Sequence, residues 1–234
     1  MENLNGTTIR YKDRYYGDVP FSYRFKYQAS VTLFSTMPGG LGHFFRRTLF
    51  PSLFKRTGKG IFFGQDIQLR YPWKIEVGEK VTLEDNTFLD AGGDPHTKIK
   101  IGDNCFIGRN TILQCKGGEI EIGDNCYIGP NTTLLSESTV KMGKFVFISG
   151  HAFILAGENH AEEKSDIPTI MQSSISKGGI IVDDDVRIGP SSTLLDGVRV
   201  GKGAIIEAGS LVHERIRPLT VNAGVPTQLI KRRD

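Results

Sequence analysis

Large aliphatic residues recur every six positions through most of the second half of this chain. The longest uninterrupted run is Val182, Ile188, Leu194, Val200, Ile206 and Val212. A period of six fits neither an α-helix, which needs a spacing near 3.6, nor a single long strand, which needs a spacing near 2. It fits a prism in which each hexad gives one short strand and one corner, and three hexads complete a coil. The sequence therefore predicts a parallel β-helix, with the aliphatic residues stacked inside and the backbones of successive coils paired.

The same spacing occurs in earlier triplets of the chain. They are Val77, Leu83 and Leu89; Ile101, Ile107 and Leu113; Ile122, Ile128 and Leu134; and Met142, Ile148 and Ile154. A glycine often follows the aliphatic residue, and the high total of 28 glycines suits a chain that turns a corner every six residues. We expect a β-helix over residues 61–216, interrupted by an inserted loop at about 156–180 and followed by a tail at 217–234.

This repeat resembles that of the hexapeptide-repeat acyltransferases, such as the maltose, galactoside and xenobiotic acetyltransferases. The resemblance covers roughly residues 61–230 and implies an all-β fold, a left-handed parallel β-helix. The left hand comes from the resemblance, because general chirality rules favour right-handed crossovers. The same fold also serves carbonic anhydrases of the γ class and non-catalytic scaffolds, so the fold alone does not fix the function.

Residues 1–60 form a separate, basic and aromatic segment with no hexads. They hold 10 Lys and Arg against 3 Asp and Glu, and 12 of the aromatic residues. Residues 38–56 read as one or two short helices with a break near Pro51. They carry an apolar stripe of Phe44, Phe45, Leu49, Phe50 and Phe54, with Arg46, Arg47, Lys55 and Arg56 as the charges around it. Three uses stay open for this partly helical appendage: a cap on the open first coil, peripheral contact with an anionic membrane through residues 38–56, or binding of an anionic acceptor.

The large interruption of the repeat carries the main functional signal. After Ile154 the hexads resume only at Val182, and the intervening loop begins Gly157-Glu158-Asn159-His160. In the family that the chain resembles, such a loop embraces the adjacent subunit of a homotrimer and carries the general base. His160 matches that histidine. An imidazole with an ordinary pKa near 6.5 can take a proton from an acceptor hydroxyl or amine at neutral pH and pass it to the departing thiolate.

Other candidate acceptor residues follow from the same resemblance. Asn131 falls near a family position that holds the acceptor or the oxyanion, Glu137 matches a substrate-binding acid loosely, and Asn159 neighbours the base. The remaining histidines are weaker candidates, and they are His43, His96, His151 and His213.

The cofactor implied by the resemblance is acetyl-coenzyme A, used as a co-substrate without a metal. The small residues that match the family's pantetheine groove are Gly189, Pro190, Ser191, Ala208 and Gly209. Lys231 and Arg232 follow a turn, Ala223-Gly224-Val225-Pro226, that resembles the family's closing turn. Their charge suits the phosphates of coenzyme A, although a solvated basic tail is the alternative.

Several function classes are disfavoured by composition and spacing. No apolar run approaches the roughly 20 residues of a membrane span, and the first ten residues do not resemble a signal peptide. Cys105 and Cys126 each precede an inward isoleucine by two positions, so we expect buried thiols in a reducing, cytoplasmic setting. No zinc motif and no nucleic-acid-binding motif are present.

The sequence favours an acyl-coenzyme A-dependent O- or N-acyltransferase acting on a sugar or saccharide intermediate. The alternatives are a non-catalytic scaffold and a metalloenzyme similar to γ-class carbonic anhydrase, which would need three converging histidines. The basic aromatic appendage favours an exopolysaccharide or cell-envelope sugar intermediate as the acceptor, lipid-linked sugars included, while antibiotic and thiogalactoside acceptors stay open.

Overall fold

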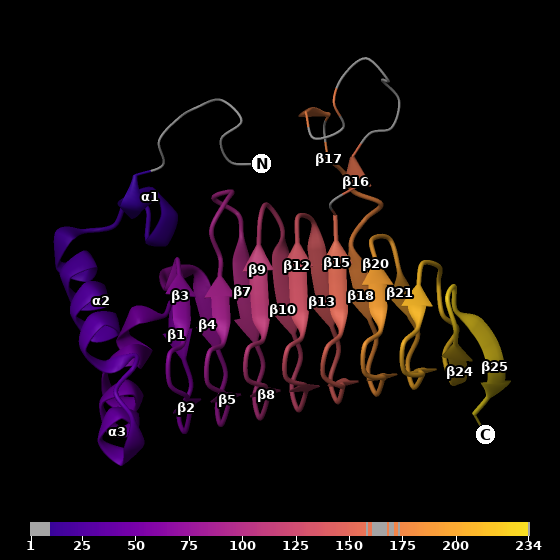
Figure 1. Ribbon diagram of the computed structural model, residues 1–234, viewed down its shortest axis with the longest axis horizontal. Helices are drawn as coiled ribbons and strands as arrows, with labels where there is room; N and C mark the ends of the chain where they lie inside the picture. Colours follow the sequence, from indigo (N-terminus) through magenta and orange to yellow (C-terminus); the bar gives the residue numbers. More distant parts are fainter. Residues whose placement is uncertain (1–9, 158, 161–167, 169–170, 173, 234) are drawn as a thin grey trace.

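Each predicted hexad forms a short strand followed by a corner, and the strands stack into three parallel sheets (Figure 1). The computed structural model describes residues 10–157, 159–160, 168, 171–172 and 174–233. The chain passes from sheet A to sheet B to sheet C and back to sheet A in every coil. We call the three lines of corners the A–B edge, the B–C edge and the C–A edge.

Sheet A consists of β1 (Arg56–Thr57), β4 (Ile75–Val77), β7 (Lys98–Ile101), β10 (Glu119–Ile122), β13 (Thr139–Met142), β18 (Ile180–Val182) and β21 (Arg199–Val200). Sheet B consists of β2 (Phe62–Phe63), β5 (Thr82–Leu83), β8 (Phe106–Ile107), β11 (Tyr127–Ile128), β14 (Phe147–Ile148), β19 (Arg187–Ile188), β22 (Ile205–Ile206), β24 (Thr220–Ala223) and β25 (Gln228–Arg232). Sheet C consists of β3 (Gln68–Arg70), β6 (Phe88–Asp90), β9 (Ile112–Cys115), β12 (Thr133–Ser136), β15 (Phe153–Ala156), β20 (Thr193–Leu195) and β23 (Leu211–Val212).

The predicted aliphatic residues form the core in continuous columns. On sheet B, Ile107 pairs with Ile128, which pairs in turn with Ile148, and the column continues through Ile188 to Ile206. All five side chains are fully buried. The structure thus confirms the predicted fold class, an all-β, left-handed parallel β-helix with helices at its amino-terminal end.

The glycine-rich and asparagine-rich corners have a backbone cause. On the B–C edge, Asn110, Asn131, His151 and Ser191 all adopt positive φ angles between 56° and 61°. This left-handed conformation disfavours most side chains and is tolerated best by glycine and by asparagine, aspartate and histidine. The identity of these corner residues is therefore set first by the turn that they make.

The amino-terminal segment folds into helices that cover the first coil. They are α1 (Tyr11–Tyr15), α2 (Phe21–Phe34), α3 (Gly39–Leu49) and a 3₁₀ helix η1 (Phe50–Leu53). Phe50 is fully buried, and its ring centroid lies 5.7 Å from that of Phe63 on the first coil. The hydroxyl of buried Tyr27 donates to the carbonyl of Leu69 at 2.6 Å. Capping the solenoid is therefore one role of this segment.

Arg46 fastens α3 to the rest of the cap. Only 4% of this residue is exposed, although the sequence grouped it with the surface charges of this segment. Its guanidinium donates to the carbonyls of Met37 at 2.6 Å, Phe34 at 3.0 Å and Phe63 at 3.2 Å. A buried charge needs such partners, so Arg46 serves the packing of the cap rather than its surface.

The β-helix extends beyond the predicted range at both ends. Thr57, Phe63 and Leu69 pair with Val77, Leu83 and Leu89, so one more coil precedes the first predicted triplet. At the carboxyl end, β24 pairs parallel with β22, and β25 folds back antiparallel on β24. The residues expected to form a tail therefore extend sheet B instead of leaving the prism.

All three cysteines are buried and free. Cys105 and Cys126 lie in neighbouring coils, and their thiols reach the carbonyls of Gly123 at 3.1 Å and Gly143 at 3.2 Å. Burial raises the pKa of Cys115 to about 12, so this thiol stays protonated near neutral pH. Cys105 and Cys126 fill small core positions, as the sequence predicts.

Candidate functional site

The inserted loop leaves the prism at the C–A edge, between β15 and β18, and rises from it (Figure 1). A short antiparallel hairpin forms its stem, in which β16 (Asn159–His160) pairs with β17 (Ser174–Ile175). The backbone of His160 lies opposite that of Ser174. Glu158 lies outside the described residues. The candidate base is therefore carried by a paired stem next to the C–A edge of the fifth coil.

Asp196 holds the returning arm of this loop. Only 5% of this residue is exposed, and it lies on the C–A edge one coil beyond the loop. Its carboxylate accepts hydrogen bonds from the backbone N–H of Lys177 and, at 2.9 Å, from the N–H of Gly179. The sequence reasoning missed this residue. Counting two residues past the inward Leu194 would have placed it on the edge from which the loop departs.

The outgoing arm passes close to Glu137. Gly157 has a φ of +111°, and a Cβ atom there would lie 2.5 Å from the Cβ of Glu137. The backbone N–H of Glu137 donates to the carbonyl of Ala156 at 2.7 Å, and its carboxylate lies 4.0 Å from the ammonium of Lys116. Of the predicted site residues, Glu137 therefore lies on the edge from which the strand with Asn159 and His160 departs.

We expect Asp196→Ala to loosen the loop without unfolding the prism, because the N–H groups of Lys177 and of buried Gly179 lose their acceptor. Cleavage within residues 157–179 by a nonspecific protease should become several-fold faster, while the melting temperature changes by only a few degrees. Asp183→Ala is the matched control, since Asp183 pairs with Arg199 on the surface at 3.0 Å. Equal cleavage rates for the two variants and the unmodified protein would contradict this anchoring role.

Asn131 lies on the B–C edge, at the other end of strand β12 from Glu137. Its side chain accepts a hydrogen bond from Asn110 at 3.0 Å and lies 3.4 Å from the Nε2 atom of His151. The structure thus brings Asn131 together with His151, which the sequence ranked as a weaker candidate. It does not bring Asn131 to the inserted loop of the same chain.

The predicted cofactor residues divide between two places. The small residues Gly189, Pro190, Ser191, Ala208 and Gly209 form two neighbouring corners of the B–C edge. Lys231 and Arg232 lie exposed on β25, opposite Val221 and Thr220. Because Thr220 begins β24 at the A–B side, these cations lie at the opposite end of sheet B from the small residues. The C–A edge itself carries Gly197 and, farther along, His213.

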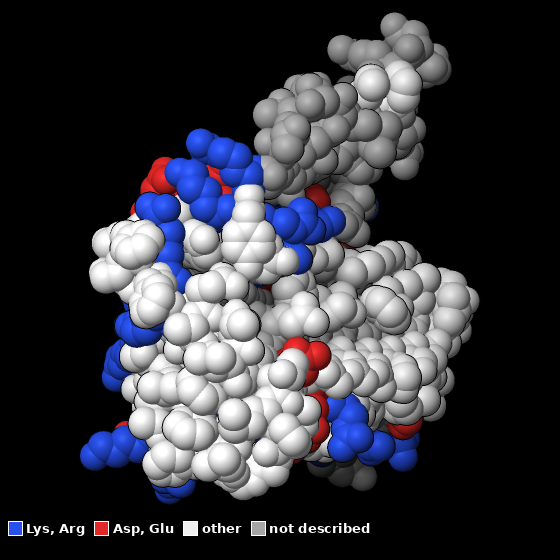
Figure 2. All heavy atoms as spheres, turned by 60° about the vertical axis from the view of Figure 1, so that its left-hand side comes forward, with Lys and Arg blue, Asp and Glu red and all other residues white. Residues whose placement is uncertain are grey.

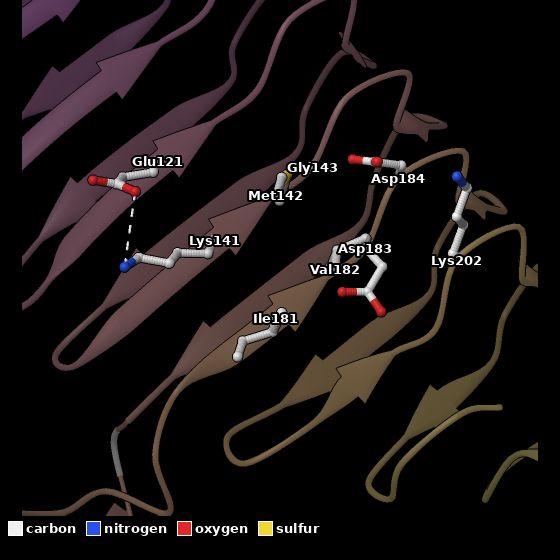
Figure 3. A pocket seen from close by; sticks show the side chains of 9 residues that line it. All are labelled: Glu121, Lys141, Met142, Gly143, Ile181, Val182, Asp183, Asp184 and Lys202. Atoms are coloured by element: carbon white, nitrogen blue, oxygen red, sulfur yellow. Dashed lines mark ion pairs between the residues drawn. The ribbon is translucent and has the colours of Figure 1, made fainter. Parts of the chain in front are cut away.

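Sheet A presents a charged outer face whose residues pair across strands. The ammonium of Lys98 lies 2.9 Å from Glu119 and 3.0 Å from Glu121, and these carboxylates raise its pKa. A shallow hollow of about 440 Å³ lies on this face between the ion pair of Glu121 with Lys141 and the side chains of Asp183 and Lys202 (Figure 3). It contains none of the residues predicted for the site, and its mixed charges favour no ligand class.

The described histidines are dispersed. His96 lies in the short loop after β6, His151 on the B–C edge, His213 after β23 and His43 on α3. Within the residues that the structure describes, no three His, Cys, Asp or Glu side chains are placed to hold a metal ion. In the same part of the chain, no helix has the length and apolar character needed to cross a membrane.

Comparison with known proteins agrees with this architecture. The family described as bacterial transferase hexapeptide (six repeats) matches residues 98–136 and 179–214. A 2,3,4,5-tetrahydropyridine-2,6-dicarboxylate N-acetyltransferase of Staphylococcus aureus is 48% identical over 56 residues. That match covers 24% of this chain and only 23% of the relative. The likeness to this enzyme is therefore confined to the repeats.

Two crystal structures of AntD variants, an N-acyltransferase from Bacillus cereus, share the fold. One, in complex with dTDP and coenzyme A, superposes with a TM-score of 0.54 at 23% identity and covers 79% of this chain and 88% of AntD. The other holds dTDP-4-amino-4,6-dideoxyglucose and coenzyme A, with a TM-score of 0.51 at 24% identity over 77% of this chain and 85% of AntD. The chain thus contains hexapeptide repeats and has the left-handed β-helix fold, as the sequence predicts.

Proposed function

We propose that this protein is an acyl-coenzyme A-dependent acyltransferase that moves an acetyl group to a hydroxyl or amine of a saccharide. The observation that carries the proposal is the loop of residues 157–179, which presents Asn159 and His160 on a paired stem beside the C–A edge of a hexapeptide prism. The N-acetyltransferase with matching repeats and the coenzyme A complexes of AntD support the same activity.

In the proposed reaction, the imidazole of His160 accepts the proton of the acceptor hydroxyl or amine. The freed oxygen or nitrogen attacks the thioester carbonyl, forming a tetrahedral intermediate whose oxyanion needs a hydrogen-bond donor. The carbon–sulfur bond then breaks, and the coenzyme A thiolate takes the proton from the imidazolium. One base and good positioning suffice, because a thioester needs neither a metal nor a covalent enzyme intermediate. Asn131 of a neighbouring chain is a candidate donor.

The three outer faces of the prism support a trimeric assembly. Sheet A is charged and its ions are paired, whereas sheet B carries the stacked rings of Phe106, Tyr127 and Phe147, with centroids 4.9 and 4.8 Å apart. Sheet C presents two largely apolar outward rows, which are half-buried in the single chain except at Phe153. One row contains Phe88, Ile112, Phe153 and Leu211 with Thr133 and Thr193 between them, and the other contains Leu135, Leu155 and Leu195 beside Gln114. Exposed apolar faces of this extent mark contacts between subunits. We propose that sheets B and C pack against neighbouring copies and that sheet A faces solvent.

In a trimer, each cleft between subunits would combine His160 of one chain with residues of its neighbour. The two groups of candidate cofactor residues are separated in a single chain, but both could contact one coenzyme A molecule in a cleft between two chains. Lys231 and Arg232 are suited to the phosphates of coenzyme A, and the small residues around Gly189 to its pantetheine arm. Separate substitutions in the two groups, measured as coenzyme A affinity, would tell which of them lines the cleft.

Phe153→Asp should break the trimer, because it places a charge in the middle of the apolar face of sheet C, where Phe153 is 47% exposed in the single chain. Light scattering should give three times the chain mass for the unmodified protein and a smaller species for the variant. Ile181→Asp is the control, since Ile181 is 37% exposed on the charged face of sheet A. A stable and active monomer of the unmodified protein would rule out the proposed assembly.

Calorimetric titration with coenzyme A tests the proposed class. An acyltransferase of this kind should bind coenzyme A with a dissociation constant in the micromolar range, about −8 kcal/mol. A scaffold with no active site should not bind it. Elemental analysis of the purified protein tests the metalloenzyme alternative, since an enzyme similar to γ-class carbonic anhydrase would contain about one zinc per chain.

A further inference from the structure

The helical cap has an outer face that its own packing does not use. Five large apolar side chains are exposed on α2 and α3, and the exposed fractions are 77% for Phe21, 67% for Phe25, 59% for Leu33, 63% for Leu41 and 60% for Phe44. We call these five residues the cap face. The buried residues of the same helices, including Tyr27 and Arg46, point to the first coil instead. The cap therefore completes the solenoid and still leaves an apolar surface uncovered.

Aromatic side chains connect α3 to α2 at the surface of the cap. The ring of Phe44 lies 5.7 Å from that of Phe45, and the ring of Phe45 is stacked on that of Phe34 at 4.5 Å. This aromatic contact joins α3 to the carboxyl end of α2, from which Leu33 also projects. Figure 2 shows this end of the molecule as a broad uncharged surface with Lys and Arg along its upper and left margins.

The charge of this part of the chain is one-sided. No Asp or Glu occurs between residues 19 and 65, whereas the same stretch contains seven Lys and Arg. Arg46 is buried, but Lys26 on α2 and Arg47 on α3 are exposed beside the cap face. The Lys26 ammonium donates to the carbonyl of Ser52 at 2.7 Å, so it is held near the helices. A partner for this surface must offer both an apolar layer and negative charge.

We propose that the cap face docks the protein on an anionic lipid bilayer. Phenylalanine and leucine side chains on surface helices insert at the boundary between headgroups and acyl chains, and Lys and Arg beside them attract anionic headgroups. The cap lies at one end of the prism (Figure 1), where His43 of α3 stacks on Phe62 of β2 with ring centroids 4.8 Å apart. In the proposed trimer with parallel prisms, three cap faces would point to the same side. Three simultaneous weak contacts would raise the affinity of the trimer for the membrane well above that of one chain.

The residues differ from those that the sequence suggested. The stripe within residues 38–56 was expected to be Phe44, Phe45, Leu49, Phe50 and Phe54, with Arg46 as part of its charge. Phe50 and Phe54 are buried against the first coil, and Arg46 is buried as well. The exposed aromatic residues of α2, Phe21 and Phe25, replace them. The membrane surface proposed here thus lies on α2 and the outer side of α3.

Sedimentation with vesicles tests this proposal. The full-length protein should sediment with vesicles of phosphatidylcholine containing about 30% phosphatidylglycerol and remain in solution with pure phosphatidylcholine. A double variant, Phe25→Ser with Phe44→Ser, should weaken partitioning about tenfold or more, and Lys26→Glu with Arg47→Glu should do the same and remove the salt dependence. Phe145→Ser is the matched control, because Phe145 is 61% exposed on the A–B edge of the prism.

Two results would overturn the proposal. One is failure of the unmodified protein to sediment with the anionic vesicles at low salt. The other is a fall in particle size by light scattering when the cap face is substituted, since that would show that the surface joins copies of the protein. Circular dichroism and the melting temperature establish that each variant is folded. Because the cap face contains no residue of the inserted loop, acyl transfer to a soluble acceptor should be unchanged in these variants, and vesicle binding is read independently of it.

Discussion

Replacing His160 with alanine should lower turnover by about 10²–10⁴-fold, which corresponds to roughly 3–5 kcal/mol of activation free energy. That range is typical of losing a positioned proton acceptor. Affinity for acetyl-coenzyme A should barely change, because the proposed role of the imidazole is to take a proton and not to hold the cofactor. The rate for the unmodified enzyme should also fall as the pH drops through the range in which an imidazole becomes protonated, near 6.5.

Two controls separate this effect from damage to the assembly. His96→Ala should cost far less, since His96 lies in the short loop after β6, three coils before the inserted loop. The size of the His160→Ala protein must be measured beside its rate, because the loop is also expected to reach the neighbouring subunit. Near-normal turnover of a trimeric His160→Ala enzyme, under conditions in which chemistry limits the rate, would refute the assignment of the base.

Arg46→Ala should produce the largest loss of stability among single substitutions in the cap. The guanidinium donates to four backbone carbonyls, of which those of Phe34, Met37 and Phe63 lie within 3.2 Å. Burial lowers the pKa of Arg46, but an arginine side chain remains protonated at any physiological pH. Its removal leaves buried acceptors unpaired, and we expect a loss of about 3–4 kcal/mol in the free energy that holds the cap on the first coil.

Thermal unfolding and protease sensitivity of residues 10–53 measure this loss. Arg46→Lys should be intermediate, because one ammonium cannot reach all of the carbonyls that the planar guanidinium reaches. Arg47→Ala is the control, since its side chain is exposed on the same helix. If Arg46→Ala and Arg47→Ala unfold alike, Arg46 does not fasten the cap.

The solenoid could be predicted from the sequence because each hexad places one large aliphatic residue at a fixed position in the coil. Ile107, Ile128 and Ile148 are in register in the structure as the spacing requires. The expected range began at residue 61 and left out the first strand of the first coil, because threonine occupies its inward position, at Thr57, where later coils have a large aliphatic residue. Helix α2 was also missed, since its aromatic residues point both into the cap and out to solvent and give no clear helical period.

The site is harder to predict, because the same residue types occur at corners that have no function beyond making the turn. Asn131, for example, has a positive φ, and turn geometry alone favours an asparagine there. The residues that hold the inserted loop, Asp196 and Gly157, gain their roles from contacts between different coils. Those contacts depend on the edge of the prism from which the loop departs. To find that edge from the sequence, each hexad must first be assigned to sheet A, B or C along the whole repeat.

The most direct test of the central claim is a mass-spectrometric screen for acetyl transfer. The purified protein is incubated with acetyl-coenzyme A and a panel of nucleotide sugars, lipid-linked sugars and simple glycosides. We expect one acceptor class to gain the mass of a single acetyl group, with release of one equivalent of free coenzyme A, and we expect His160→Ala to abolish that product. Tight binding of coenzyme A without acetyl transfer to any saccharide, or transfer that His160→Ala leaves intact, would contradict the account.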